Sequence, residues 1–285
     1  MTVPEIRPQD MQTILAALAG GTARVERVRL SDRSVWIKRY SRDGLRIFAR
    51  LQAPLAALLK QPVLRPSPLK KPEGYVDREV RQIAAFSAAG FLTPAIFFRG
   101  PRALVLSHLG ETVMAQMDAL RDSDPQAHDA LLVRCAAELG NIHAAGLCHG
   151  RPHPRDFIID NGQFGVLDFE EDPAAVMPRE TAQARDVVLL FLQIASRSRL
   201  AETSGNAFAA WRAVAPPLTQ SALRQVLPLF AGFLPAARFV HRIIGGKDIA
   251  RFVNAIEFLT AASAPAPDGA APLTQNFATK AGNHE

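Results

Sequence analysis

The chain has 285 residues, of which 48% are hydrophobic, with a formal net charge of +6 and an isoelectric point near 9.8. This length and composition allow a sizeable core in one large domain or two lobes. No apolar run approaches the roughly 20 residues that cross a bilayer, the N-terminus lacks the apolar core of a secretory signal, and the 2 cysteines cannot build a disulfide framework. We therefore expect a protein of the reducing cytosol. Its positive charge suits an anionic partner, without choosing among nucleotide, nucleic acid and lipid headgroup.

The N-terminal third begins with a short amphipathic helical pattern at residues 9–19, which ends at Gly20-Gly21. Residues 23–30 alternate apolar and charged side chains, the period of a half-buried strand, and 34–40 is a second β-rich segment after a turn. In an extended strand Trp36, Lys38 and Tyr40 share one face. Further along we expect a basic helical insertion at 42–71, a helix at 77–89, and strands at 93–99 and 103–107.

The C-terminal part is mostly helical in pattern. Asp124-Pro125 is a helix start signal, and the helix is predicted to run to residue 145; Asn161-Gly162 predicts a hairpin turn, and helices continue from Asp168 to about 262. Strands followed by helices indicate the α+β class. We expect two lobes, a small β-rich N-lobe at 1–106 and a helical C-lobe at 107–263, followed by a disordered tail at 264–285.

The most specific stretch lies between residues 142 and 170. It contains His-Gly-Arg-Pro-His-Pro-Arg-Asp at 149–156 and Val-Leu-Asp-Phe-Glu at 166–170. This resembles the catalytic loop and metal-binding strand of the protein-kinase-like fold, and it is similar in particular to bacterial lipopolysaccharide kinases of the Kdo and heptose kinase type. In that branch the loop usually reads His-Gly-Asp-x-x-x-x-Asn. Here Arg151 stands in place of the catalytic aspartate and Asp156 in place of the asparagine.

The resemblance implies that Mg-ATP binds between the lobes. It assigns Lys38 to the phosphates, with Glu79 as its ion-pair partner, and it assigns Ser107, His108 and Leu109 to the passage that meets adenine. Asp156 and Asp168 would hold Mg²⁺, which prefers hard oxygen ligands, while Asp156 and Arg151 would be the catalytic residues. It also assigns His149 and Asp186 to holding the loop backbone. The competing interpretation of Lys38 is a solvated strand lysine. That of Glu79 is an exposed helix glutamate, with Asp77 or Glu73 as the alternative partner of the lysine. That of 104–110 is an ordinary buried edge strand.

Two features depart from the family pattern. No glycine lies in the turn at 31–34, so the phosphate-covering loop is absent unless Gly20-Gly21 takes part; these two residues equally suit a helix C-cap. Arg151 cannot accept a proton, so it would stabilise transferred charge or bind an anionic acceptor. His153 is a candidate substitute base, against the plainer interpretation of a solvated loop histidine.

These patterns predict an ATP-dependent phosphotransferase acting on a sugar, or on a lipid-linked or lipopolysaccharide-type saccharide, in the cytoplasm. The alternatives are a pseudokinase with a nucleotide-binding regulatory role and a peripheral membrane adaptor. Segment 42–71 combines leucines with arginines in a basic amphipathic pattern that can rest on the inner membrane, or pack on the N-lobe with a solvated face. No nucleic-acid motif is present, and we expect no nucleic-acid partner.

Overall fold

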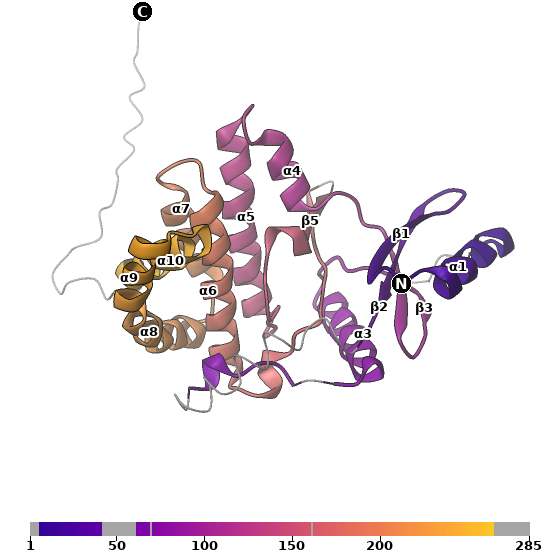
Figure 1. Ribbon diagram of the computed structural model, residues 1–285, viewed down its shortest axis with the longest axis horizontal. Helices are drawn as coiled ribbons and strands as arrows, with labels where there is room; N and C mark the ends of the chain where they lie inside the picture. The colour runs from indigo at the N-terminus through magenta and orange to yellow at the C-terminus, as the bar shows by residue number, and fades with distance from the viewer. Residues whose placement is uncertain (1–5, 42–60, 69, 161, 265–285) are drawn as a thin grey trace, which may run out of the picture.

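The computed structural model describes residues 6–41, 61–68, 70–160 and 162–264. Figure 1 shows a small lobe built on a sheet and a larger lobe built of helices, joined side by side. The α+β, two-lobed architecture predicted from the order of the elements is therefore confirmed. Most of the predicted basic segment and nearly all of the predicted tail, 42–60 and 265–285, lie outside the described residues.

In the part of the chain that the structure describes, the N-lobe is a four-stranded antiparallel sheet with a helix on each face. Its strands lie in the order β1-β2-β4-β3, and Lys38 of β2 is registered between Val25 and Leu104. In Figure 1, α1 lies beyond the sheet and α3 lies between the sheet and the C-lobe. The element bounds are α1 Pro8–Gly20, β1 Val25–Arg29, β2 Ser34–Arg39, α3 Pro72–Ala88, β3 Ile96–Arg99 and β4 Ala103–Ser107.

The alternation of β2 sorts its side chains between the two faces. Val35 and Ile37 are fully buried against Ile14 of α1, whereas Trp36 and Tyr40 pack with the core on the α3 side. Lys38 is consequently delivered to the α3 side, together with Trp36 and Tyr40, as the two-residue period of a strand requires.

The C-lobe core is built from long helices around a short hairpin. Gly140 allows α5 and α7 to approach closely, because a Cβ there would lie 2.4 Å from Val214 Cγ2 and 2.9 Å from the Trp211 carbonyl oxygen. The hairpin β5–β6 pairs Ile158 with Gly165 and carries the predicted loop and strand into the interlobe region. The element bounds are α4 Val113–Leu120, α5 Pro125–Ala144, β5 Phe157–Asp160, β6 Gln163–Val166, α6 Arg179–Arg197, α7 Thr203–Val214, α8 Pro217–Gly232, α9 Leu234–Ile244 and α10 Lys247–Ala262.

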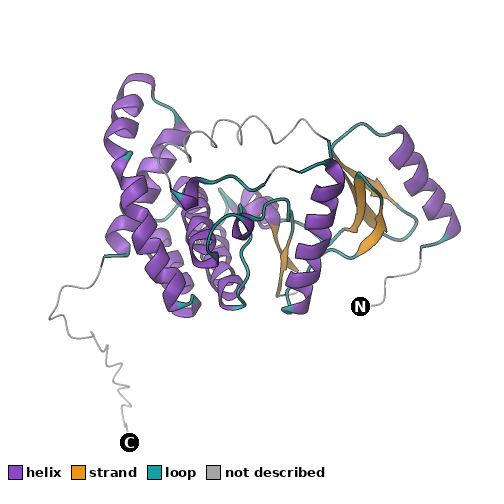
Figure 2. Cartoon of the chain, turned by 90° about the horizontal axis from the view of Figure 1, so that it is seen from below, coloured by secondary structure: helices purple, strands orange, loops and turns teal. Residues whose placement is uncertain are grey.

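Figure 2 shows the sheet and the helical lobe separated by α3, with the β5–β6 hairpin beside that helix. Three short 3-10 turns, η1 Pro62–Leu64, η2 Pro154–Asp156 and η3 Pro173–Ala175, connect these parts. Among the described helices none is alone long and apolar enough to cross a membrane. The pair α8 and α9, which meet at a bend of 44°, reaches that length and composition together.

Candidate functional site

The loop that begins at His149 is fixed by a buried carboxylate on α6. Asp186 is fully buried and accepts hydrogen bonds from the main-chain nitrogens of His149 at 2.7 Å and Gly150 at 2.9 Å. The His149 ring donates from Nε2 to the Leu167 carbonyl oxygen at 3.0 Å and lies edge-on to Phe157. The predicted scaffold roles of Asp186 and His149 are therefore confirmed.

Gly150 is required by both its backbone and its surroundings. Its φ is +94°, in the left-handed region that favours glycine, and an added Cβ would lie 2.5 Å from Glu171 Cβ and 3.1 Å from Pro173 Cδ. Such a close approach leaves no room for a side chain, so the loop and the segment after Asp168 are packed directly against one another.

Asp168 lies where the chain leaves the hairpin, and its backbone directs the carboxylate into the interlobe space. Its φ of 61° makes it the one non-glycine residue with a positive φ among those described. Aspartate tolerates this conformation better than most side chains do. Phe169 then packs on Phe86 of α3 with ring centroids 4.8 Å apart, and Arg78 donates to the Glu170 carbonyl oxygen at 2.7 Å. The segment 168–170 is thereby held against α3.

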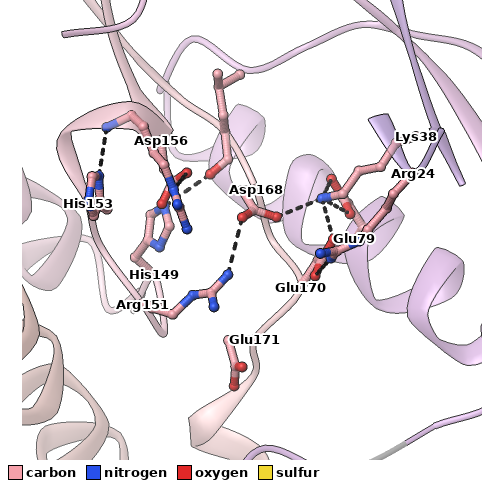
Figure 3. Close-up of polar contacts among 12 residues, drawn as sticks. Arg24, Lys38, Glu79, His149, Arg151, His153, Asp156, Asp168, Glu170 and Glu171 are labelled. Carbon is pink, nitrogen blue, oxygen red and sulfur yellow. Dashed lines mark hydrogen bonds and ion pairs between the residues drawn. The ribbon is translucent and has the colours of Figure 1, made fainter. Parts of the chain in front are cut away.

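Lys38 is surrounded by three carboxylates (Figure 3). Its Nζ lies 2.8 Å from Glu79 Oε2, 2.7 Å from Asp168 Oδ1 and 3.0 Å from Glu170 Oε1. The ion pair expected between Lys38 and Glu79 is present, and Tyr40 donates its hydroxyl to the same glutamate. Burial acts to lower the pKa of Lys38, but the negative charges of Glu79, Asp168 and Glu170 outweigh it and raise that pKa. Lys38 is therefore a permanent cation at physiological pH.

The pKa values of the two candidate metal ligands, Asp156 and Asp168, are shifted in opposite directions. Burial acts to raise the pKa of Asp168, but Lys38 outweighs it through its charge and its hydrogen bond and holds that pKa well below the usual range. Burial, and then the charge of Asp168, raises the pKa of Asp156. One carboxylate is thus kept ionised, and its neighbour is inclined to hold a proton.

Lys38, Asp156 and Asp168 open into one cavity of about 410 Å³ between the lobes. Ser107 and Leu109 of the connecting segment also contribute to its lining. This places the cationic group from the sheet and the two carboxylates from the C-lobe around a shared space.

The ring of His108 supports a neighbouring side chain: its Nδ1 accepts from Trp36 Nε1 at 3.1 Å, because the Trp36 N–H needs an acceptor when it is partly buried. Contact with adenine at Ser107, His108 and Leu109 is expected from the main chain, and it stays a prediction.

The oxygen donors fit a divalent cation. Asp156 is 5% exposed, and its Oδ2 has no hydrogen-bond partner within the described structure; an orphaned buried carboxylate oxygen is costly unless something binds it. Carboxylate oxygens of Glu79, Asp168 and Glu170 also lie within 4.8 Å of one another. Asp156 and Asp168 are the residues that would hold Mg²⁺, which commonly takes one or two carboxylates together with phosphate oxygens.

Arg151 approaches Asp168 from the opposite side to Lys38 (Figure 3). Its Nη2 lies 3.6 Å from Asp168 Oδ2, and its side chain is 41% exposed. The residue in the position of the missing catalytic aspartate is thus an electrostatic partner of a candidate metal ligand. At this distance it can neutralise charge, but it cannot take a proton.

His153 is a weak base in these surroundings. Burial, followed by the charge of Arg197, lowers the pKa of His153 to about 4. Its Nδ1 accepts from the Arg155 main-chain nitrogen at 3.1 Å, so it caps η2. The candidate role as substitute base is a poor match for a ring this weakly basic and already engaged.

Gly20-Gly21 and the turn at 31–34 both make contacts with α1. Gly21 caps α1, its N–H donating to the Ala17 carbonyl oxygen with a φ of −82°, and the turn at Ser31 is bound by Asp10, which accepts from the Ser31 main-chain nitrogen at 2.9 Å. In protein kinases the glycine-rich loop precedes a lysine on the third strand. Here Lys38 lies on the second strand that the structure describes, and the glycines have the C-cap role.

Arg24 is a site residue that the sequence did not reveal. It lines the cavity just before β1 and forms an ion pair with Glu170, which is 2% exposed. An arginine before an alternating strand carries no signal of its own, and its partner lies 146 residues away. Arg24 thus places a guanidinium at the wall of the cavity, paired with Glu170.

Comparisons with known proteins give limited likeness. No protein-family model matches the chain. A segment of 96 residues is 34% identical to a Haloquadratum walsbyi protein described as a probable bifunctional tRNA threonylcarbamoyladenosine biosynthesis protein; the match covers 32% of this chain and spans 16% of the length of that relative.

Three solved structures superpose loosely on the chain. They are a ternary complex of streptomycin, ATP and APH(2″)-IIa, at 12% identity and a TM-score of 0.35 over 90% of this chain and 99% of that one; choline kinase LicA from Streptococcus pneumoniae, at 11% and 0.37 over 85% and 91%; and a MAP kinase from Leishmania major, at 14% and 0.35 over 88% and 82%. The structure of the chain itself shows two lobes, the Lys38–Glu79 ion pair and a loop anchored by Asp186.

Proposed function

We propose that the chain is an ATP-dependent phosphotransferase that binds Mg-ATP between its lobes. The observation that carries this proposal is the convergence of Lys38, Asp156 and Asp168 on one interlobe cavity. Phosphoryl transfer depends mainly on clamped phosphates, oxygen-held metal and positioning, and these three residues have the chemistry for the first two. Adenine would lie toward Ser107 and Leu109, at the far side of the same cavity.

The reaction would move the γ-phosphoryl group of ATP to an acceptor hydroxyl. The bond between the γ-phosphorus and the β–γ bridging oxygen breaks, a new phosphorus–oxygen bond forms to the acceptor, and the hydroxyl proton leaves to water. Bound magnesium would neutralise phosphate charge. Lys38 holds phosphate oxygens, Asp156 and Asp168 hold the cation, and Arg151 stabilises the charge on the transferred group. The lack of a base costs about 10²–10⁴-fold in rate and need not abolish transfer.

The proposed acceptor is a sugar or a lipid-linked saccharide, met at the cytoplasmic side of the inner membrane. The support for this acceptor is the resemblance of loop 149–156 to lipopolysaccharide kinases. Membrane contact through 42–71 remains a prediction, because residues 42–60 and 69 lie outside the described part of the chain.

A pseudokinase is the second candidate, and one contact favours it. Arg151 Nη2 lies 3.6 Å from Asp168 Oδ2, so a protein cation already accompanies the carboxylate expected to hold the metal. Such a protein would bind nucleotide without transferring phosphate and would act through its bound conformation.

Thermal denaturation with ATP, in the presence and absence of Mg²⁺, tests the site. We expect metal-dependent stabilisation of the wild type and its loss in Asp168→Asn, which tolerates the left-handed backbone. Transfer of labelled γ-phosphate to water or to a saccharide then separates the two candidates: stabilisation without any transfer supports the pseudokinase. A wild-type protein that gains no stability from Mg-ATP contradicts both.

A further inference from the structure

The C-terminal end of α6 carries a half-buried arginine whose partners are all uncharged. Arg197 donates to Gln193 Oε1 at 2.7 Å and to Ser196 Oγ at 3.0 Å, and its Nε lies 3.5 Å from Met114 Sδ. No carboxylate oxygen of the described residues lies within 4.0 Å of this guanidinium. The negative charge of Asp118 acts on Arg197 from beyond that distance. Partly buried charges usually have a direct counter-charge, so Arg197 retains capacity to bind an anion.

Other cations converge on the same place. Arg197 Nη2 lies 3.3 Å from His153 Nε2, and Arg155 follows that histidine by two residues. The charges of Arg155 and Arg251 act on both His153 and Arg197, in each case lowering the pKa alongside the larger effect of burial. Arg251 is paired within α10 with Asp248, whose side chain is 91% exposed. We call Arg155, Arg197 and Arg251, with His153, the arginine cluster.

The arginine cluster lies beside η2, which packs on α4. Arg197, at the end of α6, reaches both Met114 of α4 and His153. Arg155 lines the interlobe cavity beside Asp156. Figure 3 places His153 beyond Asp156, on the side opposite Lys38. A molecule at the arginine cluster would therefore approach the candidate metal ligands from the C-lobe, away from the lysine that meets the nucleotide.

We propose that the arginine cluster binds a phosphate or carboxylate group carried by the acceptor, so that the acceptor is anionic. This inference rests on the proposed function, because it names the substrate class of the same site. Guanidinium groups bind such oxyanions in a planar, two-pronged geometry. Arg155 lies 3.5 Å from Asp156 Oδ1 and Arg251 lies 2.8 Å from Asp248 Oδ1. Arg197 has no such ion pair among the described residues, and an anionic acceptor would supply its counter-charge.

Inorganic phosphate is the first probe. Its effect on the melting temperature would be followed at constant ionic strength in the wild type, Arg197→Gln, Arg251→Gln and Arg224→Gln. Arg224 lies exposed on α8, so its substitution makes the same charge change away from the arginine cluster. We expect phosphate to stabilise the wild type and Arg224→Gln, and its apparent Kd to weaken about tenfold in each of the other two variants.

Equal stabilisation of all four proteins would overturn the proposal. So would a phosphate response that Arg24→Gln removes and Arg197→Gln leaves intact, because the anion would then sit near the nucleotide site. Matching circular dichroism spectra and melting temperatures without phosphate establish that Arg251→Gln, a change at a side chain that is 37% exposed, folds normally.

Mg-ATP stabilisation measured on the same proteins separates this inference from the proposed function. We expect Arg197→Gln to be stabilised by Mg-ATP as much as the wild type is. If Mg-ATP stabilises the wild type but phosphate binding does not depend on the arginine cluster, the anion site alone is overturned. If phosphate binding depends on the arginine cluster but Mg-ATP does not stabilise the wild type, the proposed function is overturned. Co-sedimentation with phosphatidylglycerol vesicles that weakens in Arg197→Gln would assign the anion to a lipid headgroup, and phosphate binding without co-sedimentation would assign it to a soluble acceptor.

Discussion

Lys38 and Asp168 are joined directly across the two lobes, with Nζ 2.7 Å from Oδ1. The same ammonium lies 2.8 Å from Glu79 Oε2, so one side chain ties β2, α3 and the segment after β6 together. Lys38 is 9% exposed and Glu79 is 1% exposed, while Asp168 retains 25% exposure and faces the cavity. An anion that enters the cavity therefore competes with Asp168 for Lys38, and a cation competes with Lys38 for Asp168.

Replacing the shared cation should destabilise the fold as well as the site. Lys38→Met leaves Glu79, Asp168 and Glu170 close together without their central counter-charge, and removing one partner of a buried pair typically costs about 3 to 5 kcal/mol. We expect the free energy of unfolding in urea to fall by about that amount.

Two further variants establish that the loss comes from the uncompensated carboxylates. Lys247→Met, at an exposed position that begins α10, should change stability by less than about 0.5 kcal/mol. Lys38→Met combined with Glu79→Gln should cost less than the sum of the single changes, because the two residues interact directly. Additive losses would contradict the pairing.

Gly150→Ala should destabilise the loop by two separable effects. The first is the positive φ, and the second is the contact of the new Cβ with Glu171 and Pro173. Gly90→Ala is the matched control, since Gly90 has a φ of +89° with nothing within 4 Å of the added atom. We expect about 1 kcal/mol from Gly90→Ala and about 1 to 3 kcal/mol more from Gly150→Ala, measured by urea denaturation. Equal losses at the two positions would mean that the contact of the new Cβ with Glu171 and Pro173 does not lower the free energy of unfolding.

Strand alternation and the loop motif carried much of the sequence-based prediction. The period-two pattern placed Lys38 with Trp36 and Tyr40 on one face, because a strand has only two faces. The motif indicated the scaffold residues His149 and Asp186, Asn161-Gly162 indicated the hairpin, and the order of strands before helices indicated the two lobes. The α3 helix begins at Pro72, ahead of the predicted start at Asp77, because proline suits the first turn of a helix.

What the sequence did not reveal depends on contacts between distant segments. The α4 helix, Val113–Leu120, was not predicted; it is only 8 residues long and is capped by Thr112, which accepts from the Ala115 main-chain nitrogen. The pair of Arg24 and Glu170 joins residues 146 positions apart. Neither feature has a local pattern, since a short helix shows little periodicity and an ion pair has none.

Arg24 should contribute to nucleotide affinity in place of a glycine-rich loop. It lines the cavity beside Lys38, and its guanidinium can move from Glu170 to a phosphate, a stronger anion. Arg24→Gln is expected to weaken ATP binding about tenfold, the loss of one charge-assisted hydrogen bond, as measured by calorimetry. Arg29→Gln, an exposed change at the far end of β1, the strand that Arg24 precedes, controls for net charge. An unchanged ATP affinity in Arg24→Gln would restrict Arg24 to its pair with Glu170.

Asp156 should make the stability of the protein fall as the pH rises. Burial, together with the charge of Asp168, raises the pKa of Asp156 to about 8 from an ordinary value of 3.8. The folded state therefore favours the protonated carboxyl, and this contribution is fully present below pH 4 and is lost as the pH rises through 8. We expect the wild type to lose stability relative to Asp156→Asn between pH 4 and 8, because the amide does not ionise. Parallel stability curves for the two proteins across that range would show that Asp156 titrates normally in the fold.

Mg-ATP should reverse this dependence on pH, since a carboxylate that holds the metal must be ionised. Calorimetry at pH 7 should then show proton release on binding, and Asp156→Asn should abolish that release.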